Sequence, residues 1–112
     1  MIKMPKDNSY ADYIIYDVLG HINGITSKKM FSGYGIFLDT KIIAIIADGE
    51  LYFKADAKLK EKYKALGCVA FSYEREGKVI EMSYMGVTGD MLENRETITE
   101  RVYESFEISN TK

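Results

Sequence analysis

One histidine and one cysteine, His21 and Cys68, are the residues of this sequence best suited to nucleophilic catalysis or metal binding. Cysteine catalysis needs a base within hydrogen-bond reach and a third group that orients that base. The two residues are 47 positions apart, and Cys68 enters an apolar strand, a setting typical of a buried structural cysteine. Zinc sites need several clustered cysteines and histidines, which the sequence does not contain. We therefore expect no catalytic residue, no metal site and no cofactor.

The Gly33-Tyr34-Gly35 triplet is the closest approach to a phosphate-binding loop. It lacks the G-x-G-x-x-G spacing, and it leads into a strand instead of a helix N-terminus. Glycines in strands most often mark a bulge, a bend or the close approach of another element. We interpret Gly33 and Gly35 as structural glycines, with ligand contact as the less favoured alternative.

A group of basic and aromatic residues surrounds this triplet. A cation beside exposed aromatic side chains can contact protein, phosphate or a nucleic-acid base. Tyrosine combines an apolar ring with a polar tip, which suits an interface and the rim of a core equally well, so both alternatives stay open. The candidate partner contacts are Lys28, Lys29, Phe31, Tyr34, Tyr52 and Lys54.

The charge balance argues against a nucleic-acid-binding protein. The chain carries 15 basic and 17 acidic residues, a net charge of −2, whereas non-specific nucleic-acid affinity comes mainly from a basic surface. The four lysines between residues 58 and 64 fall on two flanks of an expected helix, as on a solvated surface. We do not expect nucleic acid to be a direct ligand.

Short apolar runs and three amphipathic segments must position these residues. The expected strands are residues 29–32, 34–38, 42–47, 51–54, 69–75 and 78–87, and the expected helices are residues 9–19, a segment within 56–67 and a last helix from about Asn94. Residues 21–26 are expected to form a loop. Because the gaps between strands are short, the strands should pair antiparallel. The predicted fold is α+β, with an antiparallel sheet and helices on one face in two layers, in the order α-β-β-β-β-α-β-β-α.

Length and composition fit one ordinary globular domain. The 112 residues are 46% hydrophobic and 29% charged, so we expect a single domain over residues 1–112 with an ordered core of about residues 9–107. No apolar run is long enough to cross a bilayer, and the N-terminus lacks the apolar stretch of a signal peptide. A single cysteine suits a reducing compartment, so we expect a cytoplasmic protein without a membrane partner.

The glycine triplet and the strands after it resemble the N-terminal domain of the TfoX/Sxy regulators of bacterial competence. The resemblance rests on Lys29-Met30-Phe31-Ser32-Gly33-Tyr34-Gly35 and on Ala47-Asp48 with Leu51-Tyr52-Phe53-Lys54, and it continues through Phe71, Tyr73 and Met82-Ser83-Tyr84 to the last helix. Two positions depart from the family pattern. Lys29 replaces an arginine and lacks its planar fork, and Ser32 replaces a glycine and reduces the freedom of the backbone.

The resemblance implies a two-layer α+β domain, similar to YgaC-like and secretion-chaperone-like folds, without known catalytic residues. In the competence regulators a C-terminal domain follows this one, whereas we expect this chain to be the domain alone, because it ends before a second domain could begin. We therefore expect a non-enzymatic regulatory module, active in competence and transcription regulation, that binds another protein whose identity the sequence does not give. A homodimer stays open because antiparallel sheets have exposed edge strands.

Two alternatives belong to other functional classes. The first is a small-ligand-binding or enzymatic domain with a pocket between helix and sheet, where tyrosine hydroxyls and Asp48 would supply the polar groups. The second is a nucleic-acid accessory protein, whose binding would weaken steeply with salt.

Overall fold

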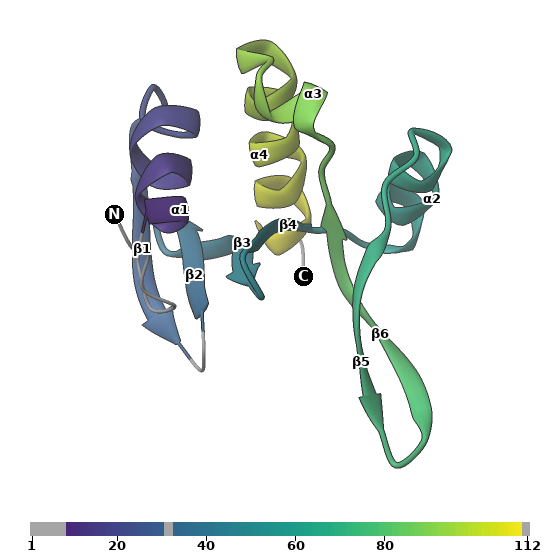
Figure 1. Ribbon diagram of the computed structural model, residues 1–112. Helices are drawn as coiled ribbons and strands as arrows, with labels where there is room; N and C mark the ends of the chain where they lie inside the picture. The colour runs from purple at the N-terminus through teal and green to yellow at the C-terminus, as the bar shows by residue number, and fades with distance from the viewer. Residues whose placement is uncertain (1–8, 31–32, 111–112) are drawn as a thin grey trace.

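Alternating apolar residues and tight turns fold the strands of this chain into an antiparallel sheet (Figure 1). The computed structural model describes residues 9–30 and 33–110. The strands are β1 (Ile25–Met30), β2 (Gly33–Leu38), β3 (Lys41–Ala47), β4 (Glu50–Lys54), β5 (Ala70–Arg75) and β6 (Lys78–Gly86). The helices are α1 (Ser9–Asp12), which continues as the π-helical segment η1 (Tyr13–Val18), α2 (Ala57–Ala65), α3 (Gly89–Leu92) and α4 (Arg95–Asn110).

The strand order in the sheet is β1-β2-β3-β4-β6-β5, and each pair of neighbouring strands is antiparallel. Two-residue turns join β2 to β3, β3 to β4 and β5 to β6. In the turns Asp48-Gly49 and Glu76-Gly77 both residues have positive φ, the backbone that a type I′ hairpin turn requires. After α2, the chain places β6 and not β5 next to β4, so β5 is an edge strand.

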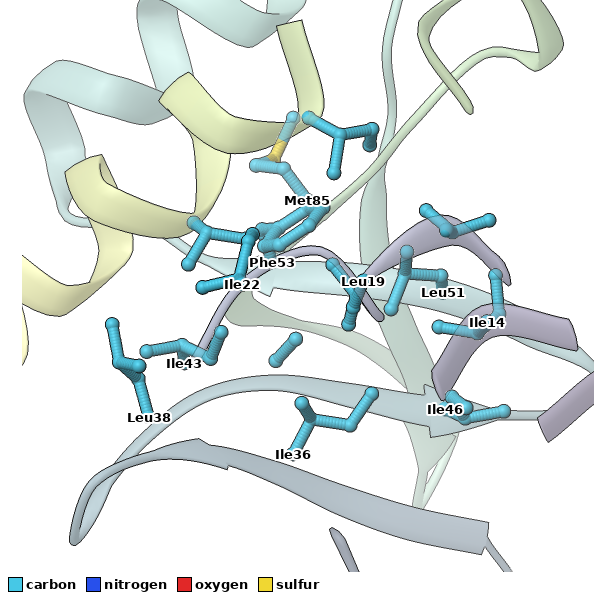
Figure 2. Close-up of a cluster of buried hydrophobic side chains, with 14 of the residues drawn as sticks. Ile14, Leu19, Ile22, Ile36, Leu38, Ile43, Ile46, Leu51, Phe53 and Met85 are labelled. Carbon is cyan, nitrogen blue, oxygen red and sulfur yellow. The ribbon is translucent and has the colours of Figure 1, made fainter. Parts of the chain in front are cut away.

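The helices cover one face of the sheet, and the main core lies between the two layers. Figure 2 shows Ile36 of β2 and Phe53 of β4 in one cluster with Ile14 of η1, and all three are fully buried. Met85 of β6 and Val102 of α4 extend the same core. Burying a side chain of this size stabilises the fold by about 1.5–3 kcal/mol. The α+β fold and the element order predicted from the sequence are thereby confirmed.

Polar contacts fix α4 against the sheet. The Ser105 hydroxyl donates a hydrogen bond to the Lys54 carbonyl oxygen at 2.8 Å, and the Ser109 hydroxyl donates to the Ile42 carbonyl oxygen at 2.7 Å. The helix begins where predicted, since Asn94 Oδ1 accepts from the Thr97 amide at 3.0 Å as an N-cap. The two serine hydrogen bonds join residues more than 50 positions apart in sequence.

Two predicted elements differ in the structure. Strand β1 begins at Ile25, inside the segment expected to be a loop, because the whole of β1 pairs with β2 from Ile25 opposite Leu38 to Met30 opposite Gly33. Its Thr-Ser-Lys-Lys centre gives little apolar signal, and the pairing decides its conformation. The first helix changes from α to π geometry at Tyr13, with the Leu19 amide donating to the Ile14 carbonyl at 2.9 Å.

No helix in the described part of the chain is long and apolar enough to span a membrane.

Candidate interaction surface on the open face of the sheet

The strand register sorts side chains onto two faces of the sheet. Directly opposite residues of antiparallel strands share a face, and neighbours along one strand alternate. A row of paired residues on one face crosses five strands: Lys28, Gly35, Ile45, Tyr52 and Gly86. The residues next to this row in β2, β3, β4 and β6 belong to the helix-covered core. The row therefore lies on the opposite face, which we call the outer face. In Figure 1, α4 lies above β3 and β4, and the β5–β6 hairpin extends downward, away from α4.

The outer face is rich in apolar side chains. Its aromatic residues are Phe37, Tyr52, Phe71, Tyr73 and Tyr84, and its aliphatic residues are Met30, Ile42, Ile45, Ile80 and Met82. Ile45 is only 5% exposed although it does not belong to the helix-side core, and Tyr73 is 41% exposed. The uncovered face of an antiparallel sheet is usually polar. Large apolar patches on a protein surface often mark interaction sites, so the outer face is a candidate binding surface.

Tyr52 and Phe71 form the centre of this surface. Their ring centroids are 4.9 Å apart with the planes tilted by 53°, an arrangement favourable for aromatic pairs. Gly86 lies opposite Tyr52 in β6, and a Cβ added there would come within 3.5 Å of the Tyr52 ring. At that distance a methyl group would make an ordinary contact, whereas a larger side chain would meet the ring. Burial and the nearby Glu50 and Asp48 carboxylates raise the pKa of Tyr52.

Basic residues accompany the aromatic ones. Among the described strand positions, the register puts four basic residues and one acidic residue on the outer face: Lys28, Lys54, Arg75, Lys78 and Glu50. Within the described residues none of the four basic side chains takes part in an ion pair. The outer face is thus positive in a chain whose net charge is −2.

The lysines of α2 behave differently. Lys60 and Lys64 lie 2.8 and 3.7 Å from the Glu81 carboxylate, and Lys62 lies 2.6 Å from Glu104. Glu104 also accepts two hydrogen bonds from the buried Arg101 guanidinium, at 2.8 and 3.0 Å. These lysines join α2 to β6 and α4, so they do not form a separate anion-binding patch.

The predicted contact residues fall on both sides of the sheet. Lys28, Tyr52 and Lys54 lie on the outer face. Lys29 pairs with Tyr34 on the helix side, where Tyr34 packs against the core, and Phe31 lies outside the described residues. The structure therefore brings together only part of the predicted group.

Sequence reasoning did not assign Phe37 or the β5–β6 aromatics to this surface. Phe71 and Tyr73 are two positions apart in one strand, as are Met82 and Tyr84 in the next, so the members of each pair share a face. This spacing could have grouped these side chains once the uncovered face was known.

The two residues considered for nucleophilic chemistry have separate partners. His21 Nε2 lies 2.7 Å from Thr99 Oγ1, and because the Thr99 hydroxyl donates to the Arg95 carbonyl, it accepts a hydrogen bond from His21. The Cys68 thiol points instead to Met91 Sδ at 3.7 Å, and burial raises the pKa of this thiol. In the part of the chain that the structure describes, no cluster of three His, Cys, Asp or Glu residues could hold a metal ion.

A small cavity of about 140 Å³ lies among η1, α3 and the start of α4. It is lined by Tyr13, Asp17, Val18, Leu92, Glu93 and Arg95. Asp48, the polar group of the predicted helix–sheet pocket, lies exposed in the β3–β4 turn and does not line this cavity.

Comparison with known proteins adds a family match. Residues 17–108 match the family described as the TfoX N-terminal domain. Among curated proteins, the chain is similar to the DNA transformation protein TfoX1 of Aliivibrio fischeri, with 21% identity over 80 residues. The alignment covers 71% of this chain and 38% of the relative, so the chain spans well under half of that protein's length.

Proposed function

Because this chain belongs to the TfoX N-terminal domain family, we propose that it is a non-enzymatic regulatory module that binds another protein through the outer face of its sheet. The relative's name refers to DNA transformation, and the proposal extends that process to this chain, as control of competence at the level of transcription in the cytoplasm. Among the described residues, neither His21 nor Cys68 has the partners of a catalytic group, which supports a binding role.

The observation that carries the proposal is the apolar layer on the sheet face without helices. An interface core is typically formed by aromatic residues and methionine, with charged residues at its rim. The outer face has this composition: Tyr52 and Phe71 are in ring contact at its centre, and exposed Arg75 and Lys78 lie at the end of the β5–β6 hairpin. Large apolar patches on monomeric proteins commonly mark such interaction sites.

A matched pair of tyrosine variants tests the proposal. Tyr73 on the outer face and Tyr103 on α4 are similarly exposed, at 41% and 46%, but they lie on different sides of the molecule. The immobilised protein would be incubated with lysate of the source cells, with and without nuclease treatment, and retained proteins would be identified by mass spectrometry. We expect wild type and Tyr103→Ser to retain the same specific protein, and Tyr73→Ser to lose it.

Two results would contradict the proposal. Equal retention by Tyr73→Ser and wild type would move the contact away from the outer face. Retention that disappears with nuclease would favour the nucleic-acid accessory alternative, because such a complex depends on the nucleic acid.

A further inference from the structure

The charges of the outer face lie at the two ends of an apolar track. Lys54 pairs with Tyr84 near one end of β6, and Lys78 lies six residues before Tyr84 at the other end, opposite Arg75. Met82 and Ile80 lie between them on the same face. At about 3.4 Å per residue, the track is roughly 20 Å long.

The burial pattern of β6 shows that this track is partly packed. Ile80, Met82 and Tyr84 are half-buried, while the alternate residues Val79, Glu81 and Ser83 are exposed. Val79 and Glu81 belong to the other face, where Glu81 pairs with Lys60 of α2. The track residues therefore form one continuous strip, alongside Phe71 and Tyr73 of β5.

We propose that this strip binds an acidic protein segment, whose apolar side chains pack along β6 and whose carboxylates meet Lys54 at one end and Arg75 with Lys78 at the other. The inference rests on the proposed function and adds the chemistry of the partner. A stretch of about six extended residues has the length of the track, so the acidic residues should flank an apolar stretch of that length.

Charge complementarity disfavours a two-fold contact between this strip and the same strip of a second copy. Two outer faces packed against each other by two-fold symmetry would bring basic residues against basic residues. Placing like charges against each other at an interface costs several kcal/mol of binding free energy, which disfavours such a partner. Lys54 is already half-buried, so a basic surface pressed against it would make this cost larger.

A single-stranded nucleic acid fits the strip less well than a protein segment. Bases stack on aromatic rings, but much of the track is the aliphatic Ile80 and Met82. The Glu50 carboxylate lies close enough to raise the pKa of Tyr52 together with burial, and it would repel a phosphate near the central ring pair. An apolar segment with flanking acids avoids both conflicts.

The test is selection of random peptides displayed on phage against the purified protein. Peptides enriched by wild type should contain more Asp and Glu than Lys and Arg, on both sides of an apolar stretch. The variant with Arg75→Glu and Lys78→Glu should lose this acidic bias. Both substituted side chains are exposed, so the variant should keep the wild-type fold. The matched control is Lys58→Glu on α2, which is also exposed and has no ion pair within the described residues.

Binding of a selected peptide, measured by fluorescence anisotropy, should weaken about tenfold or more in the double variant and stay unchanged in Lys58→Glu. Lys54→Glu should weaken it as well, with circular dichroism confirming the fold. Selection without acidic bias, or equal affinity for wild type and double variant, would overturn the proposal.

Three further outcomes separate the remaining interpretations. Binding of an oligothymidine that the double variant loses would identify the strip as a nucleic-acid site and overturn the inference. A dimer in analytical ultracentrifugation that the double variant abolishes would do the same in favour of a second copy. If Tyr73→Ser loses the cellular partner while the charge variants keep it, the proposed function stands and only the acidic chemistry fails.

Discussion

The Tyr52 ring contacts the Phe71 ring at a centroid distance of 4.9 Å, although β4 and β5 are separated in the sheet by β6. The contact crosses β6 at Gly86, the residue opposite Tyr52. A residue with a large side chain at Gly86 would stand between the rings. The outer face therefore has a packed aromatic centre of its own, separate from the helix-side core.

A double-mutant cycle should measure this contact. Tyr52→Ala and Phe71→Ala should each lower the free energy of unfolding. The double variant should lose less than the sum of the two single losses, because either substitution alone already removes the contact between the rings. Aromatic pairs of this geometry couple by about 0.5–1.5 kcal/mol. Urea unfolding followed by circular dichroism gives the three differences.

The control cycle combines Tyr52→Ala with Tyr103→Ala on α4, where the effects should add within about 0.5 kcal/mol. Equal coupling in both cycles would mean that the Tyr52–Phe71 contact is not the source of the effect.

Much of the fold follows from local sequence signals, but the assignment of faces does not. The turns at Asp48-Gly49 and Glu76-Gly77 have the residue types that hairpins require, so strand pairing could be predicted. Strand β3 is apolar at each position from Ile42 to Ala47, so alternation cannot tell which of its residues face the helices. Only the register, set by pairing with β2 and β4, puts Ile45 on the outer face.

The candidate site was predicted only in part for a similar reason. Lys28 and Lys29 are neighbours in sequence and look equivalent, but a strand turns them to opposite faces. Phe71 joins Tyr52 only because β6 inserts between β4 and β5, a topological fact without a local signal. A grouping by nearness in sequence therefore combined residues that the sheet separates. It also missed residues, distant in sequence, that the sheet brings together.

Alanine substitution of three glycines should destabilise the protein in the order Gly33, Gly35, Gly89. A Cβ at Gly33 would collide with the Ile46 carbonyl oxygen, a main-chain atom that cannot move alone, so we expect a loss of about 3 kcal/mol or a failure to fold. A Cβ at Gly35 would collide with the flexible Met30 side chain, and should cost about 1–2 kcal/mol.

The matched control in this series is Gly89→Ala, which should stay within about 0.5 kcal/mol because nothing lies within 4 Å of the added atom. Thermal unfolding with soluble expression levels would rank the three variants. A Gly33→Ala protein as stable as Gly89→Ala would show that the β2–β3 approach is not as close as described.

Removing the Tyr63 hydroxyl should leave the protein as stable or more stable. Tyr63 is fully buried, and its hydroxyl has no hydrogen-bond partner among the described residues. An unsatisfied buried polar group costs about 1–3 kcal/mol, so Tyr63→Phe should raise the free energy of unfolding by up to about 1 kcal/mol.

Tyr63→Leu serves as the comparison for this substitution. It also removes the ring, over which the Arg101 guanidinium carbon lies 5.6 Å from the centroid, and should cost about 2–4 kcal/mol. A loss of more than about 1 kcal/mol in Tyr63→Phe itself would indicate that the hydroxyl has a bound partner.

Stability should fall at alkaline pH. Burial raises the pKa of Tyr63 and of Tyr84 above the ordinary value of 10.0, and raises the pKa of Cys68 above 9.0. As pH rises through these ordinary values, the unfolded chain releases the protons first while the native protein still holds them. The native state then binds more protons than the unfolded state, so the free energy of unfolding decreases with pH. This stabilisation is complete below about pH 8 and is lost progressively above it.

Urea unfolding between about pH 8 and 11 would measure the decrease, whose slope approaches about 1.4 kcal/mol per pH unit for each proton retained. Tyr63→Phe should flatten the curve above about pH 10, because the variant has no hydroxyl there to titrate in the unfolded chain. A free energy of unfolding that stays level or rises over this range would mean that the buried hydroxyls and the thiol release their protons as easily in the native state as in the unfolded chain.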